Sequence, residues 1–257
     1  MNIRSLYRKL YLVLVLSACL TISLLYVLLS GKTTEHKENE KKSVVTAEPA
    51  ATPSSSPSTI QTQTPEIITY DTTSNDSLIR IVNKSHTIEQ NYVPSDLVSP
   101  NVSQYEYQKL RSEAATALEN MFQAASSDHI SLYLVSGYRS YSFQEDLQTY
   151  YQNQLGDTEA GRIDCIPGAS EHQIGLAVDL CTTDHLYELN TNFDTTEAYQ
   201  WLIRNCADYG YILRYPQGKE EITGIKYSPW NYRYVGVEYA KEIMDSDLTM
   251  EEYFSSN

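Results

Sequence analysis

The sequence contains little cysteine. There are four cysteines in 257 residues, and no two of them stand in a Cys-x-x-Cys spacing, which excludes a zinc site built from such thiolate pairs. Cys19 lies in an apolar N-terminal run, so Cys165, Cys181 and Cys206 remain beyond it. Two interpretations of these three stay open: one disulfide, with Cys165 and Cys181 as the pair to test, or three buried thiols.

Basic side chains are scarce as well. The chain has 19 Lys and Arg against 33 Asp and Glu, a net charge of −14. Residues 77–257 alone contain 12 basic and 26 acidic side chains. Binding to nucleic acid depends on basic patches, and the sequence has no Gly-rich phosphate loop. Nucleic acid is therefore excluded as a partner.

Phenylalanine and tryptophan are few, whereas tyrosine is abundant. The chain has 4 Phe and 2 Trp but 22 Tyr. A tyrosine can bury its ring while its hydroxyl stays hydrated, which suits a surface that binds polar ligands. A general amino-acid bias of the organism also explains the high tyrosine count.

The first thirty residues contain a long hydrophobic run. Residues 10–29 are almost wholly apolar and uncharged, and Arg4, Arg8 and Lys9 precede them. About twenty helical residues cross the hydrocarbon core of a membrane, and basic flanks stay in the cytoplasm. A cleaved signal peptide would have a shorter apolar region, and the lipoprotein-like box ending at Cys19 is followed by ten more residues of the run. We expect a cytoplasmic segment at 1–9 and a transmembrane anchor at 10–30.

The next segment lacks apolar periodicity. Residues 31–76 are rich in Lys, Glu, Thr, Ser and Pro, as in TAEPAATPSSSPSTIQTQTP. Such a composition buries too little surface to offset chain entropy. The sequence predicts a disordered linker that holds a globular domain, residues 77–257, outside the cell membrane.

The globular part mixes both kinds of element. Its patterns predict four helices and four short strands. The predicted helices are 105–125, 143–155, 195–209 and 237–244, and the strands are 130–135, 176–181, 211–215 and 230–235. Helices come first and strands cluster late, which favours an α+β fold with a small, mostly antiparallel sheet and flanking helices.

Two candidate metal ligands lie close together in the sequence. His172 and Asp179 are separated by Gly175, which can end a helical turn so that the second ligand stands on the following strand. An imidazole and a carboxylate supplied in this way suit Zn²⁺. By itself this spacing is weak, because a single His is more often structural.

The surrounding residues resemble a known family. SEHQIGLAVDL (170–180) is similar to the Ser-x-His-x-x-Gly-x-Ala-x-Asp signature of VanY-type D-alanyl-D-alanine carboxypeptidases, which have the hedgehog/DD-peptidase fold. The resemblance runs from about residue 79 to 245. Three further stretches carry it: IVNKSHTIEQNYVPSDLV (81–98), SGYRSYSFQ (136–144) and LRYPQGKEEITGIKYSPWNYRYVG (213–236).

The resemblance implies a zinc peptidase that removes the terminal D-Ala from peptidoglycan stem peptides. It places metal ligands at His172, Asp179 and Asn231, the general base at Ser228, and a group that binds substrate or developing charge at Arg139. It also implies that substrate contacts come from five further residues: Ser136, Tyr138, Gln144, Ser170 and Trp230.

Two positions depart from the family pattern. The third ligand is His in the family and Asn231 here, and the base is Glu in the family and Ser228 here. An amide oxygen is a poor zinc ligand, and a hydroxyl cannot act as a base near neutral pH. Possible substitutes (His86, His129, His185 and the Glu220–Glu221 pair) are best explained as surface or loop residues.

The sequence therefore predicts a membrane-anchored, extracytoplasmic carboxypeptidase-like protein of peptidoglycan metabolism. We expect it to bind stem peptides ending in D-Ala, with zinc doubtful and catalysis impaired. Two alternatives stay open: a working metallo-carboxypeptidase that assembles its metal differently, and a non-catalytic envelope component that binds protein.

Overall fold

The computed structural model describes residues 69–164, 166–185 and 189–256. The expected anchor at 10–30 and most of the expected linker at 31–76 lie outside these residues. Among the residues described, no helix is both long enough and apolar enough to span a membrane.

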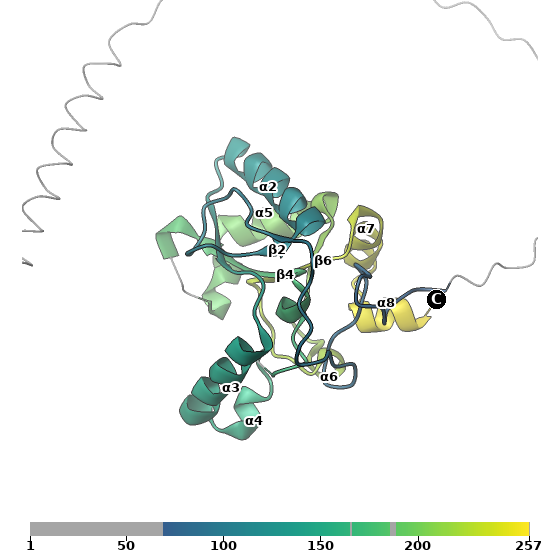
Figure 1. Ribbon diagram of the computed structural model, residues 1–257. Helices are drawn as coiled ribbons and strands as arrows, with labels where there is room; N and C mark the ends of the chain where they lie inside the picture. The colour runs from purple at the N-terminus through teal and green to yellow at the C-terminus, as the bar shows by residue number, and fades with distance from the viewer. Residues whose placement is uncertain (1–68, 165, 186–188, 257) are drawn as a thin grey trace, which may run out of the picture. The chain divides into compact units, whose positions relative to one another are not determined.

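A four-stranded antiparallel sheet forms the centre of the fold (Figure 1). Its strand order is β3-β4-β6-β5. The strands are β3 (Leu132–Ser136), β4 (Ala177–Thr182), β5 (Tyr211–Leu213) and β6 (Asn231–Tyr234). A separate two-stranded pair joins β1 (Leu97–Val98) to β2 (Leu110–Arg111). The predicted α+β fold with a small antiparallel sheet is confirmed.

Helices surround this sheet. The α-helices are α2 (Ser112–Ser127), α3 (Tyr141–Leu155), α4 (Asp157–Ala160), α5 (Glu197–Asn205), α6 (Glu220–Thr223), α7 (Val237–Ser246) and α8 (Met250–Ser256). Short 3₁₀ turns occupy η1 (Glu171–Ile174), η2 (Thr183–His185), η3 (Thr191–Thr195) and η4 (Cys206–Tyr209). In Figure 1, α2 and α5 lie together on one side, α3 and α4 project from the other end, and α7 and α8 lie near the C-terminus.

The main core lies between α2, α5 and the sheet. Leu118 and Met121 of α2, Leu202 of α5 and Leu180 of β4 are all fully buried in one cluster. Complete burial of each such side chain contributes about 1.5–3 kcal/mol. A second cluster beneath α7 and α8 contains Ile212, Ala240, Ile243 and Met250, among others. Together the two clusters hold the sheet, which carries much of the candidate site, in place.

One predicted element begins too early, and one element was not predicted. The helix predicted from residue 105 begins only at Ser112, because Leu110 and Arg111 pair with β1. No pattern predicted the short α8, which docks through buried Met250 and Tyr253 and through the ion pair of Glu251 with Arg214. The helix predicted over 195–209 corresponds to η3's last residue, α5 and η4, and it ends at Gly210 in the left-handed conformation, as expected.

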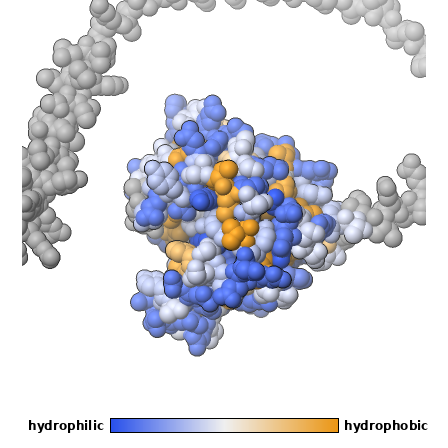
Figure 2. All heavy atoms as spheres, in the orientation of Figure 1, coloured by the Kyte–Doolittle hydropathy of each residue, from blue (hydrophilic) through white to orange (hydrophobic). Residues whose placement is uncertain are grey.

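Many tyrosines serve the core rather than the surface. Tyr211, Tyr215, Tyr232, Tyr234 and Tyr253 are buried. Tyr70, Tyr239, Tyr253 and Phe254 pack edge to face around α7 and α8. The face shown in Figure 2 is mainly hydrophilic, with a small hydrophobic group near its centre. A tyrosine-rich surface is therefore only part of the explanation for the tyrosine content.

Candidate functional site

The local sequence fixes His172 in place. Ser170 caps the 3₁₀ turn η1 by accepting a hydrogen bond from the His172 backbone N–H at 3.3 Å. Gly175 ends the turn in the left-handed region with φ of +67°. A Cβ at that position would lie 2.9 Å from Leu97 Cδ2. Glycine is therefore required here, and β4 with Asp179 follows directly, as predicted.

The register of two strands brings Asn231 to the same point. β4 and β6 pair Asp179 with Asn231 across the sheet. The Asn231 Nδ2 atom donates to Asp179 Oδ1 at 2.9 Å and lies 3.1 Å from His172 Nε2. The structure thus brings the three positions of the implied metal site together. All three are buried, with 2% exposure or less.

The partners of these groups fix the orientation of the Asn231 amide. His172 Nδ1 lies 2.7 Å from the Gly137 carbonyl oxygen, which can only accept a hydrogen bond. Nδ1 therefore carries a proton. The ionised Asp179 Oδ1 can only accept. Turning the amide over would set its oxygen against Asp179 Oδ1, so Nδ2 points toward Asp179.

Arg139 holds the other side of Asp179. It donates from Nε to Ser136 Oγ at 2.8 Å and from Nη1 to the Asp164 carbonyl oxygen at 3.2 Å, and its Nη2 pairs with Asp179 Oδ2. Burial raises the pKa of Asp179, but the influence of His172 and Arg139 and the Asn231 hydrogen bond outweigh it and hold that pKa below its usual range. Asp179 is thus kept ionised without a metal ion.

Asp164 is a site residue that no sequence motif marked. Its side chain is 10% exposed, and its Oδ2 lies 3.8 Å from His172 Nε2. Neither carboxylate oxygen has a hydrogen-bond partner. Burial raises the pKa of Asp164, and His172, Arg139 and Ser170 offset only part of that rise. An acid in the stretch before SEHQ was the only signal available in the sequence.

These side chains lie at the bottom of an open groove of about 790 Å³. We call five of its polar residues, whose side chains are buried or nearly so, the floor: Arg139, Asp164, Asp179, Ser228 and Asn231. The walls include six aromatic residues, Tyr105, Tyr107, Tyr138, Phe143, Tyr151 and Trp230, together with polar and charged residues such as Glu106 and Lys109. Ser228 cannot serve as a base, because its hydroxyl donates to the Lys226 carbonyl oxygen at 2.9 Å.

The other predicted residues divide into two groups. Ser136, Tyr138 and Trp230 line the groove, and their contact with substrate stays a prediction. Gln144 and Ser170 do not line it, because both are fully buried behind it. Gln144 instead donates to the Asp164 carbonyl oxygen at 3.4 Å. Both residues thus support groove residues rather than face a ligand.

Among the described side chains, those of His86, His129, Glu220 and Glu221 do not line the groove. His86 is exposed and bonds its ring to Asn83, and His129 is exposed beyond the end of α2. His185 ends η2, while Glu220 and Glu221 open α6. Their interpretation as surface or loop residues agrees with these positions. Cys206 is a buried free thiol, and Cys165 lies outside the described residues, so its pairing stays a prediction.

A buried charge cluster supports the site from behind. Glu171, next to His172, accepts a hydrogen bond from Arg214 Nε at 2.8 Å and forms an ion pair with Arg233 Nη1 at 2.7 Å. Arg214 also binds Glu251 of α8 through two nitrogens, at 2.7 and 3.0 Å. Such pairs are stable only when every member keeps its partner. The cluster thus anchors η1, β5, β6 and α8 to one another.

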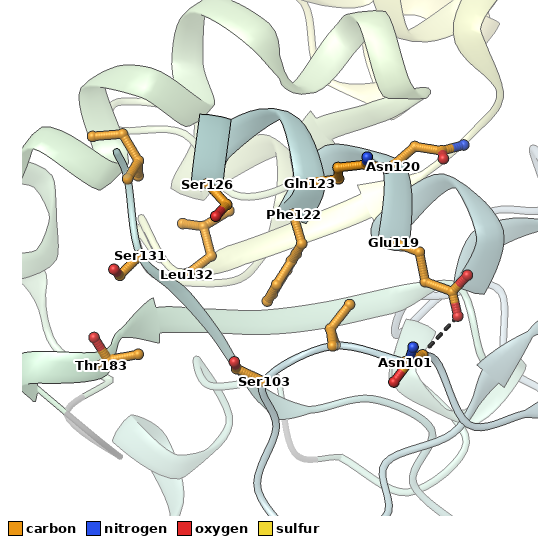
Figure 3. A pocket seen from close by; sticks show the side chains of 12 residues that line it. Asn101, Ser103, Glu119, Asn120, Phe122, Gln123, Ser126, Ser131, Leu132 and Thr183 are labelled. Atoms are coloured by element: carbon orange, nitrogen blue, oxygen red, sulfur yellow. Dashed lines mark hydrogen bonds between the residues drawn. The ribbon is translucent and has the colours of Figure 1, made fainter. Parts of the chain in front are cut away.

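A second hollow of about 460 Å³ lies away from this site, between α2 and the start of β3 (Figure 3). Asn120, Gln123 and Ser126 line it from α2. Glu119 accepts from the Asn101 backbone N–H at 2.7 Å across its edge. It contains none of the predicted site residues.

Comparison with known proteins agrees with this geometry. Residues 107–237 match the family model "VanY: D-alanyl-D-alanine carboxypeptidase". The chain belongs to the VanY family. A VanY relative, the putative carboxypeptidase YodJ of Bacillus subtilis (strain 168), is 44% identical over 184 residues, which cover 70% of this chain and 67% of YodJ.

Solved structures of VanY relatives share the fold. The LdcB LD-carboxypeptidase structure, described as revealing the molecular basis of peptidoglycan recognition, has a TM-score of 0.64 and 44% identity, covering 68% of this chain and 84% of LdcB. A mutant of the vancomycin-resistance D,D-pentapeptidase VanY in complex with Zn(II) has a TM-score of 0.58 and 32% identity, covering 68% of this chain and 97% of that one. Zinc thus belongs to the family.

The residues of this chain do not fit that zinc ion. Zinc requires lone pairs that converge on one point, whereas Asn231 directs N–H groups at both remaining ligands. Within the described residues, no group of three or more His, Cys, Asp or Glu side chains is placed to hold a metal ion. The Asn231 amide nitrogen and the Arg139 guanidinium already supply hydrogen-bond donors to both oxygens of Asp179.

Proposed function

We propose that this chain is a membrane-anchored, extracytoplasmic VanY-family protein that binds peptidoglycan stem peptides ending in D-Ala and is impaired in hydrolysing them. Binding is supported by the groove, whose aromatic walls lead to a polar floor. It is also supported by the relatives, which are carboxypeptidases of peptidoglycan metabolism. Anchoring rests on the apolar run at 10–30 with its basic flank.

The observation that carries the loss of hydrolysis is the position of the Asn231 amide. Its nitrogen bonds to the two atoms, His172 Nε2 and Asp179 Oδ1, that a metal would need as ligands. Ser228 supplies no base at the position where the family has Glu, and a positioned base typically contributes about 10²–10⁴-fold to rate. The changes at Asn231 and Ser228 therefore both affect the activation of water.

Restoring both residues tests the proposal. The double variant Ser228→Glu with Asn231→His supplies a third ligand and a base, with one position left for water. We expect this variant to retain zinc after dialysis and to release D-Ala from a stem peptide, whereas the unmodified protein does neither. Metal analysis and a D-Ala release assay measure the two results separately.

The single variants serve as controls. Each is expected to stay inactive, because a base needs activated water and bound water needs a base. Release of D-Ala by the unmodified protein at the rate of the double variant would overturn the impairment and favour a metallo-carboxypeptidase with different ligands. A double variant that folds and binds zinc but stays inert, with no peptide bound by either protein, would favour the protein-binding alternative.

A further inference from the structure

The floor contains one unsatisfied buried carboxylate. Both oxygens of Asp164 lack a hydrogen-bond partner, although the side chain is nine-tenths buried and lines the groove. A buried carboxylate without partners is unfavourable by several kcal/mol in general. A position of this kind is retained where an incoming group satisfies it.

The neighbours of Asp164 leave its oxygens without a hydrogen-bond partner. Arg139 directs its Nη2 to Asp179 and gives only a bond to the Asp164 backbone oxygen. His172 Nε2 lies 3.8 Å away, beyond hydrogen-bond distance. Ser170 is near enough to lower the pKa of the Asp164 carboxyl, but burial outweighs that effect.

Asn231 Oδ1 is a second buried acceptor that lacks a partner. It lacks one because the amide nitrogen faces His172 and Asp179 instead. Asn231 and Asp164 both line the groove. Together they offer unfilled acceptors only, which suits a ligand group that donates several hydrogen bonds.

We infer that the floor of the groove binds the primary ammonium group of a peptide, with Asp164 as its counter-ion. An ammonium carries three donors and one positive charge, and its donors match the unpaired oxygens of Asp164 and Asn231. A free carboxylate would meet Asp164 and Asp179 at close range and is disfavoured there.

The walls fit the remainder of such a side chain. Tyr138, Tyr151 and Trp230 line the path to the floor. Aromatic faces pack against an alkyl chain and attract a cation at its end. The inference rests on the proposed peptide-binding function and adds the chemical group by which the peptide is recognised.

Calorimetry on the detergent-solubilised full-length protein tests this with two probes. One is a stem peptide ending in D-Ala with lysine as its diamino acid, and the other is the same peptide with that lysine Nε-acetylated. We expect the free amine to bind at least about tenfold more tightly, since a charge-assisted hydrogen bond contributes about 1.5–3 kcal/mol.

Two variants identify the residue responsible. Asp164→Asn keeps the shape and removes the charge, so the preference for the free amine should fall to near one while binding of the acetylated peptide persists. Glu145→Gln, on the exposed face of α3, should retain the preference. Asp164→Asn should also keep or raise the thermal midpoint, because it removes a buried carboxyl group whose oxygens have no partners; a fall of the midpoint would indicate a structural role instead.

The outcomes separate this inference from the proposed function. If the unmodified protein binds both peptides equally, the ammonium inference is wrong and peptide binding stands. If it binds neither peptide, the proposed function itself is wrong. Stoichiometric binding of Zn²⁺ alone that is lost in Asp164→Asn would make a metal ion, rather than an ammonium, the partner of Asp164 and would overturn the inference.

Discussion

A single amide group decides the chemistry of the site. Asn231 occupies the cross-strand position opposite Asp179, and its orientation follows from the ionised Asp179 carboxylate. In a family that includes a zinc-bound structure, the Asn231 nitrogen instead contacts the two remaining ligand positions, His172 and Asp179, and does not add a third metal ligand.

Replacing the Asn231 amide with a carboxylate should make the site bind a metal ion more favourably. Asn231→Asp sets a carboxylate beside Asp179 Oδ1 and leaves His172 Nε2 without a donor, so we expect a loss of about 1–3 kcal/mol in the free energy of unfolding without metal. Zn²⁺ should restore part of that loss, and urea denaturation with and without Zn²⁺ measures both. Asn192→Asp, at an exposed position, should show neither effect; a zinc response there would point to unspecific binding.

Gly175 offers a test of the turn that places His172. Alanine there adds both a left-handed strain of about 1–2 kcal/mol and a contact of 2.9 Å with Leu97. Gly218→Ala has the same sign of φ, +83°, but nothing within 4 Å. We expect chemical denaturation to show a clearly larger loss for Gly175→Ala, and equal losses would mean that the close contact is relieved.

Sequence reasoning found His172, Asp179, Arg139 and the two departures because ordered motifs mark them. It could not find Asp164, since the role of this residue depends on burial rather than on a motif. It could not orient the Asn231 amide either, because that orientation depends on strand register and on the ionised Asp179 carboxylate.

At the scale of elements, periodicity predicted the helices and strands that bury one face. It missed α8, whose position depends on Glu251 meeting Arg214 across 37 residues. Its own pattern of apolar residues is too short to show this. The predicted start of α2 at residue 105 was also wrong, because pairing of β1 with β2 overrides local helix propensity there.

The Glu251 pair predicts a pH dependence of stability. Burial raises the pKa of Glu251, but Arg214 outweighs it and lowers that pKa to about 2, against about 4.3 in an unfolded chain. The contribution, about 3 kcal/mol, is therefore present above about pH 4.3 and lost as the pH falls toward about 2. In Glu251→Gln the free energy of unfolding should be lower at neutral pH and should fall less steeply over this window. Glu238→Gln, exposed on α7, should leave the pH profile unchanged.

At the scale of the whole molecule, the sequence predicts a domain held away from a membrane. We expect protease treatment of intact, wall-stripped cells to cut the predicted linker before Tyr70, which packs around α7 and α8, and to release the domain. The composition of residues 31–68 is typical of chains that do not fold. Immunoblotting of the cell and supernatant fractions measures the release. Full protection of the domain would contradict an extracytoplasmic location.

The buried arginines also constrain when the protein can finish folding. Arg233 donates to the carbonyl oxygens of Leu78 and Arg80, and Arg214 binds Glu251. Residues from the first and last parts of the domain thus meet at one buried pair. During synthesis, a nascent chain lacking residue 251 holds Arg214 without half of its counter-ions. We therefore expect the domain to close late, after nearly all of it has emerged, and a chain that stalls before α8 to be an early substrate for quality-control proteases.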